Sequence, residues 1–417
     1  MPRNILNKLL IAVTISISVA LGGVPLAAGA AARPATSAAS QVSPRAAVPW
    51  PRVGPGWVLA EYWPGRFDFV KKAIAAPVTL YLISPAGHRY QLHRWAATKQ
   101  PAYVTAWSGD KTRVLLSLNP GRVEQLTLAT GRIRPIRLST EVNPFLVSYT
   151  RPTGQGLLAV RDVRNKTQLV RLSLTGRVVK VLTSSPRDDV FVSSSAGATI
   201  AVGGATGLQL VSTNGGVIRR LPVPGTGSSG CLPARWWDSR TILATCVAKG
   251  AHRDRLWLVP ASGARPTPLT PQHGRHSADP GDFDAWGTPG ALYLQSITSN
   301  GGLLIFRQRA DGALRLIKPP GSAYDNWIMA ARGSRLLIDE VAPCRGTASL
   351  RWFSPATGRA QTLVKAPRGG SGAISVDPYG PPPANTPISV ACAAGRASRV
   401  LSSPGATGVA PGLLSRS

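Results

Sequence analysis

The fold is decided by the stretch LVRLSLTG at residues 169–176, an apolar strand pattern that ends in a small-residue turn and a glycine. A second strand pattern, RVVKVL at 177–182, follows at once. Tight hairpin turns need a positive φ angle, which glycine adopts without a Cβ clash. The stretch therefore predicts a β-hairpin whose turn lies at Gly176.

The same hairpin pattern occurs seven times, with turn glycines 39 to 49 residues apart. Upstream of most hairpins lies another pair of short strand patterns, clearest in YVTAWSGDKTRVLLSL at 103–118. Each unit thus holds four strands, and radial stacking of such sheets buries the face that a lone sheet leaves exposed. The turn glycines are Gly87, Gly131, Gly176, Gly215, Gly263, Gly312 and Gly358.

This repeat predicts an all-β protein, a seven-bladed β-propeller of four-stranded blades over residues 56–380. A row of β-sandwich domains also has short strands and turns, but a single period held over six intervals favours the propeller. The first unit is incomplete, and a spare strand pattern occurs at 371–380, SGAISVDPYG. We expect this C-terminal strand to join the first blade and close the ring, which removes an open sheet edge.

Residues 1–32 are typical of a removed secretory signal peptide, with Arg3 and Lys8 before a short apolar run and small residues at its end. A transmembrane anchor is the alternative. A spanning helix needs about 20 apolar residues, and Gly22 and Pro25 interrupt this run. The pattern therefore favours a secreted, extracellular protein.

Two segments flank the predicted propeller. Residues 33–55 are rich in Ala, Pro and Ser, which predicts a disordered linker without a core of its own. Residues 381–417 have a similar composition and predict a loose tail.

Four cysteines follow the predicted signal peptide, and an even number in a secreted chain indicates disulfide bonds. Three pairings are possible. We expect Cys231–Cys246, which an antiparallel hairpin brings together, and Cys344–Cys392, which would pin the tail beside the closing strand. Zinc binding is the alternative, and the lack of CxxC spacing disfavours it.

The segment AWSGDKTRVLL at 106–116 is similar to the WSPDGxxIAF element of TolB-like, WD40-like propeller repeats. In both, an aromatic residue precedes a polar turn and an apolar strand follows. Trp107, Ser108 and Asp110 match positions of that element. The aromatic position is held in other units by Trp237 and Trp286.

Two positions depart from the element: Gly109 replaces the usual proline and Lys111 the usual glycine. The resemblance implies the propeller fold over about 325 residues, and extracytoplasmic actinobacterial propellers look most similar overall. It gives Trp107, Asp110, Trp237 and Trp286 a structural role in the repeat. Because such propellers serve as binding scaffolds, enzyme cores and protease side domains, the resemblance implies no particular activity.

One stretch gathers potential metal ligands, HGRHSADPGDFDAW at 273–286, on a loop that would enter the sixth blade beside the central channel. The alternative is a polar connecting loop that turns at its Asp-Pro-Gly sequence, and this alternative is favoured because it explains the loop unaided. The candidate ligands are His273, His276, Asp282 and Asp284.

Charge is the remaining indication of function. The chain has 48 Lys and Arg against 18 Asp and Glu, a net charge of +30. A field of this strength attracts anions, which outside a bacterial cell are teichoic-type polymers, acidic glycans and phospholipid headgroups. Nucleic acid is disfavoured because the basic residues are not interleaved with a compact aromatic patch.

The sequence contains no GxSxG elbow, HExxH pair or phosphate-binding loop, and it indicates no cofactor and no catalytic residue. It therefore favours a secreted, non-enzymatic scaffold that binds a protein or an anionic polymer at the cell envelope. The alternative is an extracellular carbohydrate-active lyase or hydrolase that uses residues lining the central channel.

Overall fold

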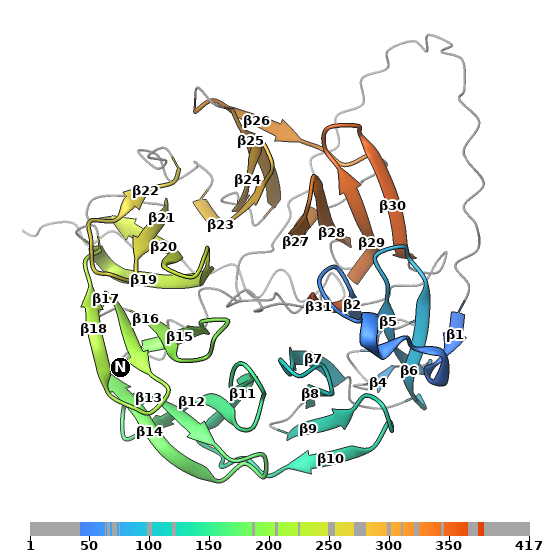
Figure 1. Cartoon of the computed structure of the whole chain (residues 1–417), viewed down its shortest axis with the longest axis horizontal. Coiled ribbons are helices and arrows are strands. Elements are labelled where there is room, and N and C mark those ends of the chain that lie inside the picture. Colours follow the sequence, from blue (N-terminus) through green and yellow to red (C-terminus); the bar gives the residue numbers. More distant parts are fainter. Residues whose placement is uncertain are drawn as a thin grey trace, which may run out of the picture.

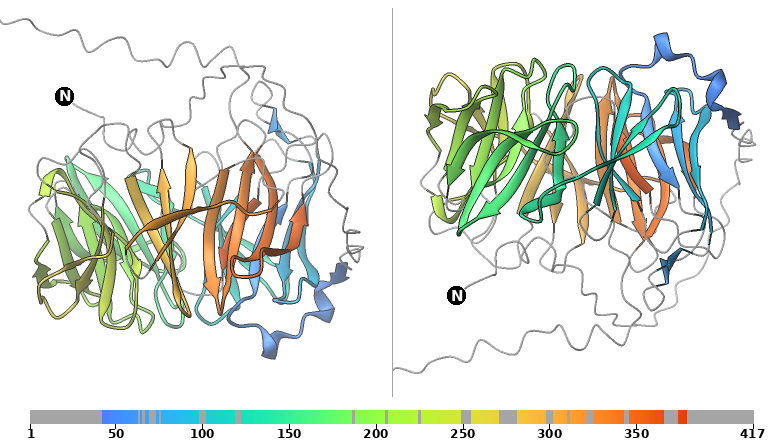
Figure 2. Two further views of the ribbon diagram at one scale, coloured as in Figure 1. Left: turned by 90° about the horizontal axis from the view of Figure 1, so that it is seen from above. Right: turned by 90° about the horizontal axis from the view of Figure 1, so that it is seen from below.

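The sheets of the computed structural model are arranged around a central axis as a β-propeller (Figure 1). Figure 2 shows them side by side, with their strands running between the two faces of a disc. The structure describes residues 42–378, except for residues 63, 65–66, 69–72, 75, 98–101, 119–121, 186–187, 205–206, 224–225, 249–254, 271–280, 298–301, 310–311, 321–324, 343–345 and 366–373.

One sheet, which we call the closing sheet, contains strands from both ends of the described chain. β31 (Ile374–Pro378) pairs antiparallel with β2 (Val58–Tyr62), and β5 (Val78–Ile83) and β6 (Arg89–Trp95) follow outward. The C-terminal strand therefore joins the first sheet as expected. A fifth strand, β1 (Val42–Pro44), runs parallel to β6 at the outer edge.

Four further sheets have four antiparallel strands each. Two of them comprise β7 (Ala102–Trp107), β8 (Arg113–Leu118), β9 (Arg122–Thr127) and β10 (Ile133–Ile136), and β11 (Val142–Tyr149), β12 (Leu157–Val163), β13 (Lys166–Leu172) and β14 (Val178–Ser185). The other two comprise β23 (Gly281–Thr288), β24 (Ala291–Ile297), β25 (Leu303–Gln308) and β26 (Leu314–Ile317), and β27 (Asp325–Arg332), β28 (Arg335–Ala342), β29 (Gly346–Ser354) and β30 (Arg359–Lys365). A small hairpin between β2 and β5 comprises β3 (Phe67–Asp68) and β4 (Ala73–Ile74).

The remaining strands form one eight-stranded sheet through the pairing of β16 with β19, and we call this sheet the half-barrel. They are β15 (Asp188–Ser193), β16 (Thr199–Gly204), β17 (Gly207–Ser212), β18 (Val217–Leu221), β19 (Thr226–Trp236), β20 (Thr241–Ala248), β21 (Arg255–Pro260) and β22 (Thr267–Pro268). The prediction of seven separate four-stranded blades is therefore wrong. The propeller has five small sheets and this half-barrel.

The half-barrel exists because β16 pairs with β19 as well as with β15 and β17, through Gly204 and Cys231. Gly203 allows this approach: a Cβ added there would lie 2.4 Å from the carbonyl oxygen of Cys231 and 2.5 Å from the Cδ of Pro233. Gly203 and Gly204 are adjacent, and two adjacent glycines are typical of a turn. The strand pattern of the sequence therefore did not predict that β16 would pair with β19 at this point.

The hairpin turns themselves agree with the sequence pattern. All seven turn glycines have positive φ angles, from 68° at Gly358 to 91° at Gly87. Several of these turns rest on the neighbouring sheet: a Cβ added at Gly176 would lie 2.1 Å from the carbonyl oxygen of Arg137, which follows β10. Glycine is therefore required there both by the turn and by the contact between sheets.

The core lies between adjacent sheets. On β8, Val114, Leu115 and Leu116 are all fully buried. Val114 and Leu116 belong to the cluster shared with the closing sheet, whereas Leu115 belongs to the cluster shared with the sheet of β11–β14. Because neighbouring sheets cover both faces of β8, its sequence is a continuous apolar run and not an alternation of apolar and polar residues.

Part of the segment expected to be a linker, residues 33–55, has defined structure. β1 is followed by two 3-10 helices, η1 (Arg45–Ala47) and η2 (Trp50–Arg52). Val48 and Val53 are buried in the core between the closing sheet and the sheet of β7–β10. These two valines anchor a segment whose overall composition is typical of a linker. In the described part of the chain, no helix is long and apolar enough to cross a membrane.

Candidate functional site

Asp110, which matches the TolB-like element, organises the turn between β7 and β8. Its Oδ1 accepts hydrogen bonds from the hydroxyl of Ser108 at 2.5 Å and from the hydroxyl and amide of Thr112 at 2.8 and 3.1 Å. Its Oδ2 accepts one from the Arg113 guanidinium group at 2.7 Å. Burial by itself raises the pKa of Asp110, but these hydrogen bonds lower it below its ordinary value. Asp110 is thereby linked to Ser108, Thr112 and Arg113 across the turn.

The two departures from the element also have local explanations. A Cβ added at Gly109 would lie 1.8 Å from the carbonyl oxygen of Pro152, so no larger residue fits there. A Cβ added at Gly197 would lie 1.8 Å from the carbonyl oxygen of Arg151. The loop after β11, which contains Arg151 and Pro152, therefore packs between the turns at Gly109 and Gly197. Lys111 has a φ angle of 65°, the left-handed conformation that favours glycine.

Of the four predicted metal ligands, only Asp282 and Asp284 belong to the described residues. His273 and His276 lie outside the described residues. Asp282 is fully buried and accepts a hydrogen bond from the hydroxyl of Ser296 at 2.5 Å. Among the residues described, no group of three or more His, Cys, Asp or Glu is placed to hold a metal ion.

Asp284 forms a buried ion pair with Arg235, and the two atoms Oδ1 and Nη1 are 2.7 Å apart. The Arg235 guanidinium carbon also lies 3.6 Å from the ring centroid of Trp286 and 5.7 Å from that of Trp237. Burial raises the pKa of Asp284, and Arg235 opposes this rise. The pair joins β19 of the half-barrel to β23 of the next sheet. Two of the three motif tryptophans, Trp237 and Trp286, therefore lie beside an arginine that the sequence pattern did not single out.

Other buried polar side chains also connect neighbouring sheets. Gln295 of β24 accepts a hydrogen bond from the amide of Ile328 at 2.8 Å and donates one to the carbonyl of Asn326 at 2.9 Å. Glu61 of β2 accepts one from the amide of Val104 on β7 at 3.3 Å. Sheets that stack only through apolar side chains can slide, and these directional bonds fix their relative position.

Cys231 and Cys246 form a disulfide bond between the adjacent strands β19 and β20. It lies beside the contact of β19 with β16 that creates the half-barrel. The other two cysteines, Cys344 and Cys392, lie outside the described residues.

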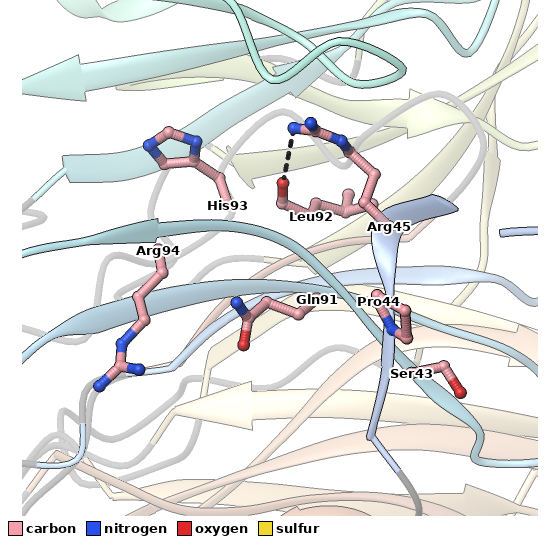
Figure 3. A pocket seen from close by; sticks show the side chains of 7 residues that line it. All are labelled: Ser43, Pro44, Arg45, Gln91, Leu92, His93 and Arg94. Carbon is pink, nitrogen blue, oxygen red and sulfur yellow. Dashed lines mark hydrogen bonds between the residues drawn. The ribbon is translucent and has the colours of Figure 1, made fainter. Parts of the chain in front are cut away.

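A cleft of about 480 Å³ lies at the outer edge of the closing sheet, between β1 and β6 (Figure 3). None of its lining residues is acidic, and three of them are basic. The lining residues are Ser43, Pro44, Arg45, Gln91, Leu92, His93 and Arg94.

Figure 3 shows the Arg45 guanidinium group and the His93 ring on the same side of this cleft, with the Arg94 guanidinium group farther away. Arg45 is held in place because its Nη1 donates a hydrogen bond to the carbonyl of Leu92 at 3.3 Å. The His93 ring packs edge-on against Trp95, with 4.5 Å between the ring centroids. The cleft therefore presents positioned cationic and hydrogen-bonding groups.

Burial lowers the pKa of His93, and the nearby Arg45 lowers it further. The ring is thus neutral at neutral pH, with one nitrogen that donates and one that accepts. An anion bound between Arg45 and His93 would favour the protonated ring. Phosphate, sulfate and carboxylate groups suit this arrangement, because they accept charge-assisted hydrogen bonds from guanidinium groups. The sequence pattern missed this site because β1 lies in the segment expected to be a linker.

No protein-family model and no curated protein matches the chain. Solved structures do: a prolyl endopeptidase is 13% identical over 72% of this chain and 47% of its own, with a TM-score of 0.51. The acylaminoacyl peptidase of Pyrococcus horikoshii is 14% identical over 75% of this chain and 52% of its own, with a TM-score of 0.50. TolB from Acinetobacter baumannii is 17% identical over 62% and 65%, with a TM-score of 0.39.

The chain has the β-propeller fold. It spans about half the length of the two peptidases, and at identities this low the similarity shows the fold alone.

Proposed function

We propose that this propeller is a secreted, non-enzymatic scaffold that binds anionic polymers of the cell envelope. The observation that carries the proposal is the cleft between β1 and β6, where Arg45 and His93 lie on the same side, Arg94 also lines the cleft and no lining residue is acidic. The disulfide between Cys231 and Cys246 supports a location outside the cytoplasm, because such bonds persist in oxidising compartments.

The net charge of +30 supports the same class of partner, since a positive field concentrates anions near the surface and speeds their association. A polymer with repeated phosphate or carboxylate groups would place one group in the cleft while others meet arginines elsewhere. An acidic protein surface would use the same charges, and it is the other form of partner that this scaffold could bind.

The test is sedimentation of the full chain with isolated bacterial cell walls at low and high salt. We expect retention at low salt, release at high salt, and about tenfold weaker binding for Arg45→Gln, which removes the cation beside His93 and its charge-assisted hydrogen bond to the bound anion. The matched control is Arg315→Gln, the same change at an exposed position on β26, outside the cleft. Absence of retention at low salt, or an equal loss in Arg315→Gln, would contradict the proposal.

The alternative is an extracellular carbohydrate-active lyase or hydrolase with its site in the central channel. The similarity to peptidases is consistent with a hydrolase but shows only the fold. Asp284, a candidate ligand that the sequence places beside the central channel, is held by Arg235 at 2.7 Å, which opposes a role in acid–base chemistry. Release of soluble sugar from wall polymer by the purified chain would establish the alternative and exclude the non-enzymatic scaffold.

A further inference from the structure

Exposed apolar side chains are concentrated on two neighbouring outer strands. In the described part of the chain, six large apolar side chains are exposed, and five of them belong to β14 and β18. Single exposed apolar residues are ordinary, but a cluster of them marks an interaction surface. The five are Val178, Val179, Val181, Val217 and Ile218, and the sixth is Leu316 on β26.

β14 and β18 form one surface, which we call the β14–β18 rim and define as residues 177–181 and 217–220. The turn before β18 rests on β14, because the amide of Gly216 donates a hydrogen bond to the carbonyl of Leu182 at 3.0 Å. A Cβ added at Gly215 would lie 2.9 Å from the Cε of Lys180. Figure 1 shows both strands at the outside of the ring, in neighbouring sheets.

The charged residues of the rim are all basic. Arg177, Lys180, Arg219 and Arg220 are exposed between or beside the apolar side chains. Residues 173–185 and 212–221, which include both strands and their turns, contain no Asp or Glu. The rim thus combines apolar side chains, which favour removal from water, with cations that have no acid on these segments to neutralise them.

We propose that the β14–β18 rim is a docking surface for an anionic lipid bilayer. The valines and Ile218 would enter the boundary between headgroups and acyl chains, while the long Lys and Arg side chains reach the phosphate groups. Charge complementarity selects this occupant. A second copy paired edge to edge would bring two sets of cations together, and a fully solvated polyanion would leave the valines in water.

The test is co-sedimentation of the full chain with vesicles of equal parts phosphatidylglycerol and phosphatidylcholine, compared with vesicles of phosphatidylcholine alone. We expect binding to the anionic vesicles only. Lys180→Gln with Arg220→Gln should weaken it by about fivefold per removed cation. Val179→Ser with Ile218→Ser should weaken it by about tenfold or more, because the apolar area that leaves water is lost. Thermal unfolding of each variant checks that the fold is intact.

The matched control is Leu316→Ser, the same kind of change at an exposed edge position on β26, beside Arg315. It should bind as the unchanged chain does. Equal binding to both kinds of vesicle, or an equal loss in Leu316→Ser, would overturn the proposal. So would a dimer in sedimentation velocity that the Val179→Ser, Ile218→Ser variant abolishes, since a second copy would then occupy the rim. Cell-wall binding through the cleft should be unaffected in that variant, which separates the two proposals.

Discussion

The outer strand of the closing sheet and the outer strands of the β14–β18 rim face the solvent in different ways. β6 is covered by β1, which Val48 and Val53 anchor in the core. β14 and β18 stand at the ends of their sheet orders and expose apolar side chains. Ring closure therefore protects the inner strands only, and the outer strands need other solutions. In the closing sheet the outer strand is covered, which leaves a polar cleft, and at the β14–β18 rim the outer strands are bare, which leaves an apolar and cationic surface.

Two other outer strands show a third arrangement. β10 contains Pro135 and β22 contains Pro268. Proline has no amide hydrogen, so these edges are poor partners for another strand. β14, β18, β26 and β30 contain no proline, and among these four outer strands β14 and β18 carry five of the six exposed large apolar side chains of the described residues.

The largest expected effect compares one substitution at the covered and the bare edge. Val53→Asp should lower the free energy of unfolding by about 4 kcal/mol, because it removes a buried apolar side chain and buries a charge. Val179→Asp, at an exposed position, should change it by less than about 0.5 kcal/mol. Chemical denaturation of both variants measures the difference. Similar losses would contradict the distinction between the two edges.

A second pair compares the hairpin turns beside each edge. Gly176→Ala, just before β14, should cost about 3 kcal/mol, because φ is 90° and the backbone oxygen of Arg137 occupies the space. Gly131→Ala should cost about 1 kcal/mol, because the atom in the way is Nη1 of Arg45, at the end of a flexible side chain. Thermal unfolding of the two variants tests this order, and Gly312→Ala, with open space around it, is the control for φ strain alone.

A third prediction concerns the covering strand. Arg45→Ala removes the hydrogen bond to the Leu92 carbonyl and should cost about 1 kcal/mol. It should also raise the pKa of His93, because the cation that helps to lower it is gone. Titration of the His93 ring by NMR measures this shift, and an unchanged pKa would show that burial acts alone. Arg94→Ala is the control, since that side chain lies farther from the ring (Figure 3).

The smallest effect is a pH dependence of stability. The folded pKa of His93 lies below the ordinary value of about 6.5, so the unfolded chain binds this proton more readily. The His93 contribution to stability should therefore be complete above about pH 6.5 and decrease as the pH falls below it. Urea unfolding at several pH values, with His93→Gln as the reference, isolates this contribution. If the unfolding free energy of His93→Gln depended on pH as strongly as that of the unchanged chain, the predicted contribution of His93 would be contradicted.

Several elements were predictable from the sequence because their causes are local. Gly176 and its equivalents end hairpins, since the turn itself requires a positive φ angle. The disulfide partners Cys231 and Cys246 lie on adjacent strands of one hairpin. Asp110 organises the residues on either side of it along the chain.

The candidate cleft was not predictable in this way. Arg45 and His93 are far apart in the sequence and meet only because β1 pairs with β6. The segment around Arg45 has the composition of a linker, and it is ordered by Val48 and Val53, whose burial depends on two sheets. The amino-acid composition of residues 33–55 therefore did not predict the cleft, because the cleft forms only when other parts of the chain pack against this segment.

Most strands, the glycine turns and the excess of positive charge were thus predictable from the sequence, because these depend on neighbouring residues or on simple sums. Only the tertiary structure decided that β16 joins β19 into a half-barrel, that Arg235 pairs with Asp284, and which outer strands are covered. These contacts join strands that are not consecutive along the chain. Their energies depend on distance and burial in the assembled ring, which no local pattern contains.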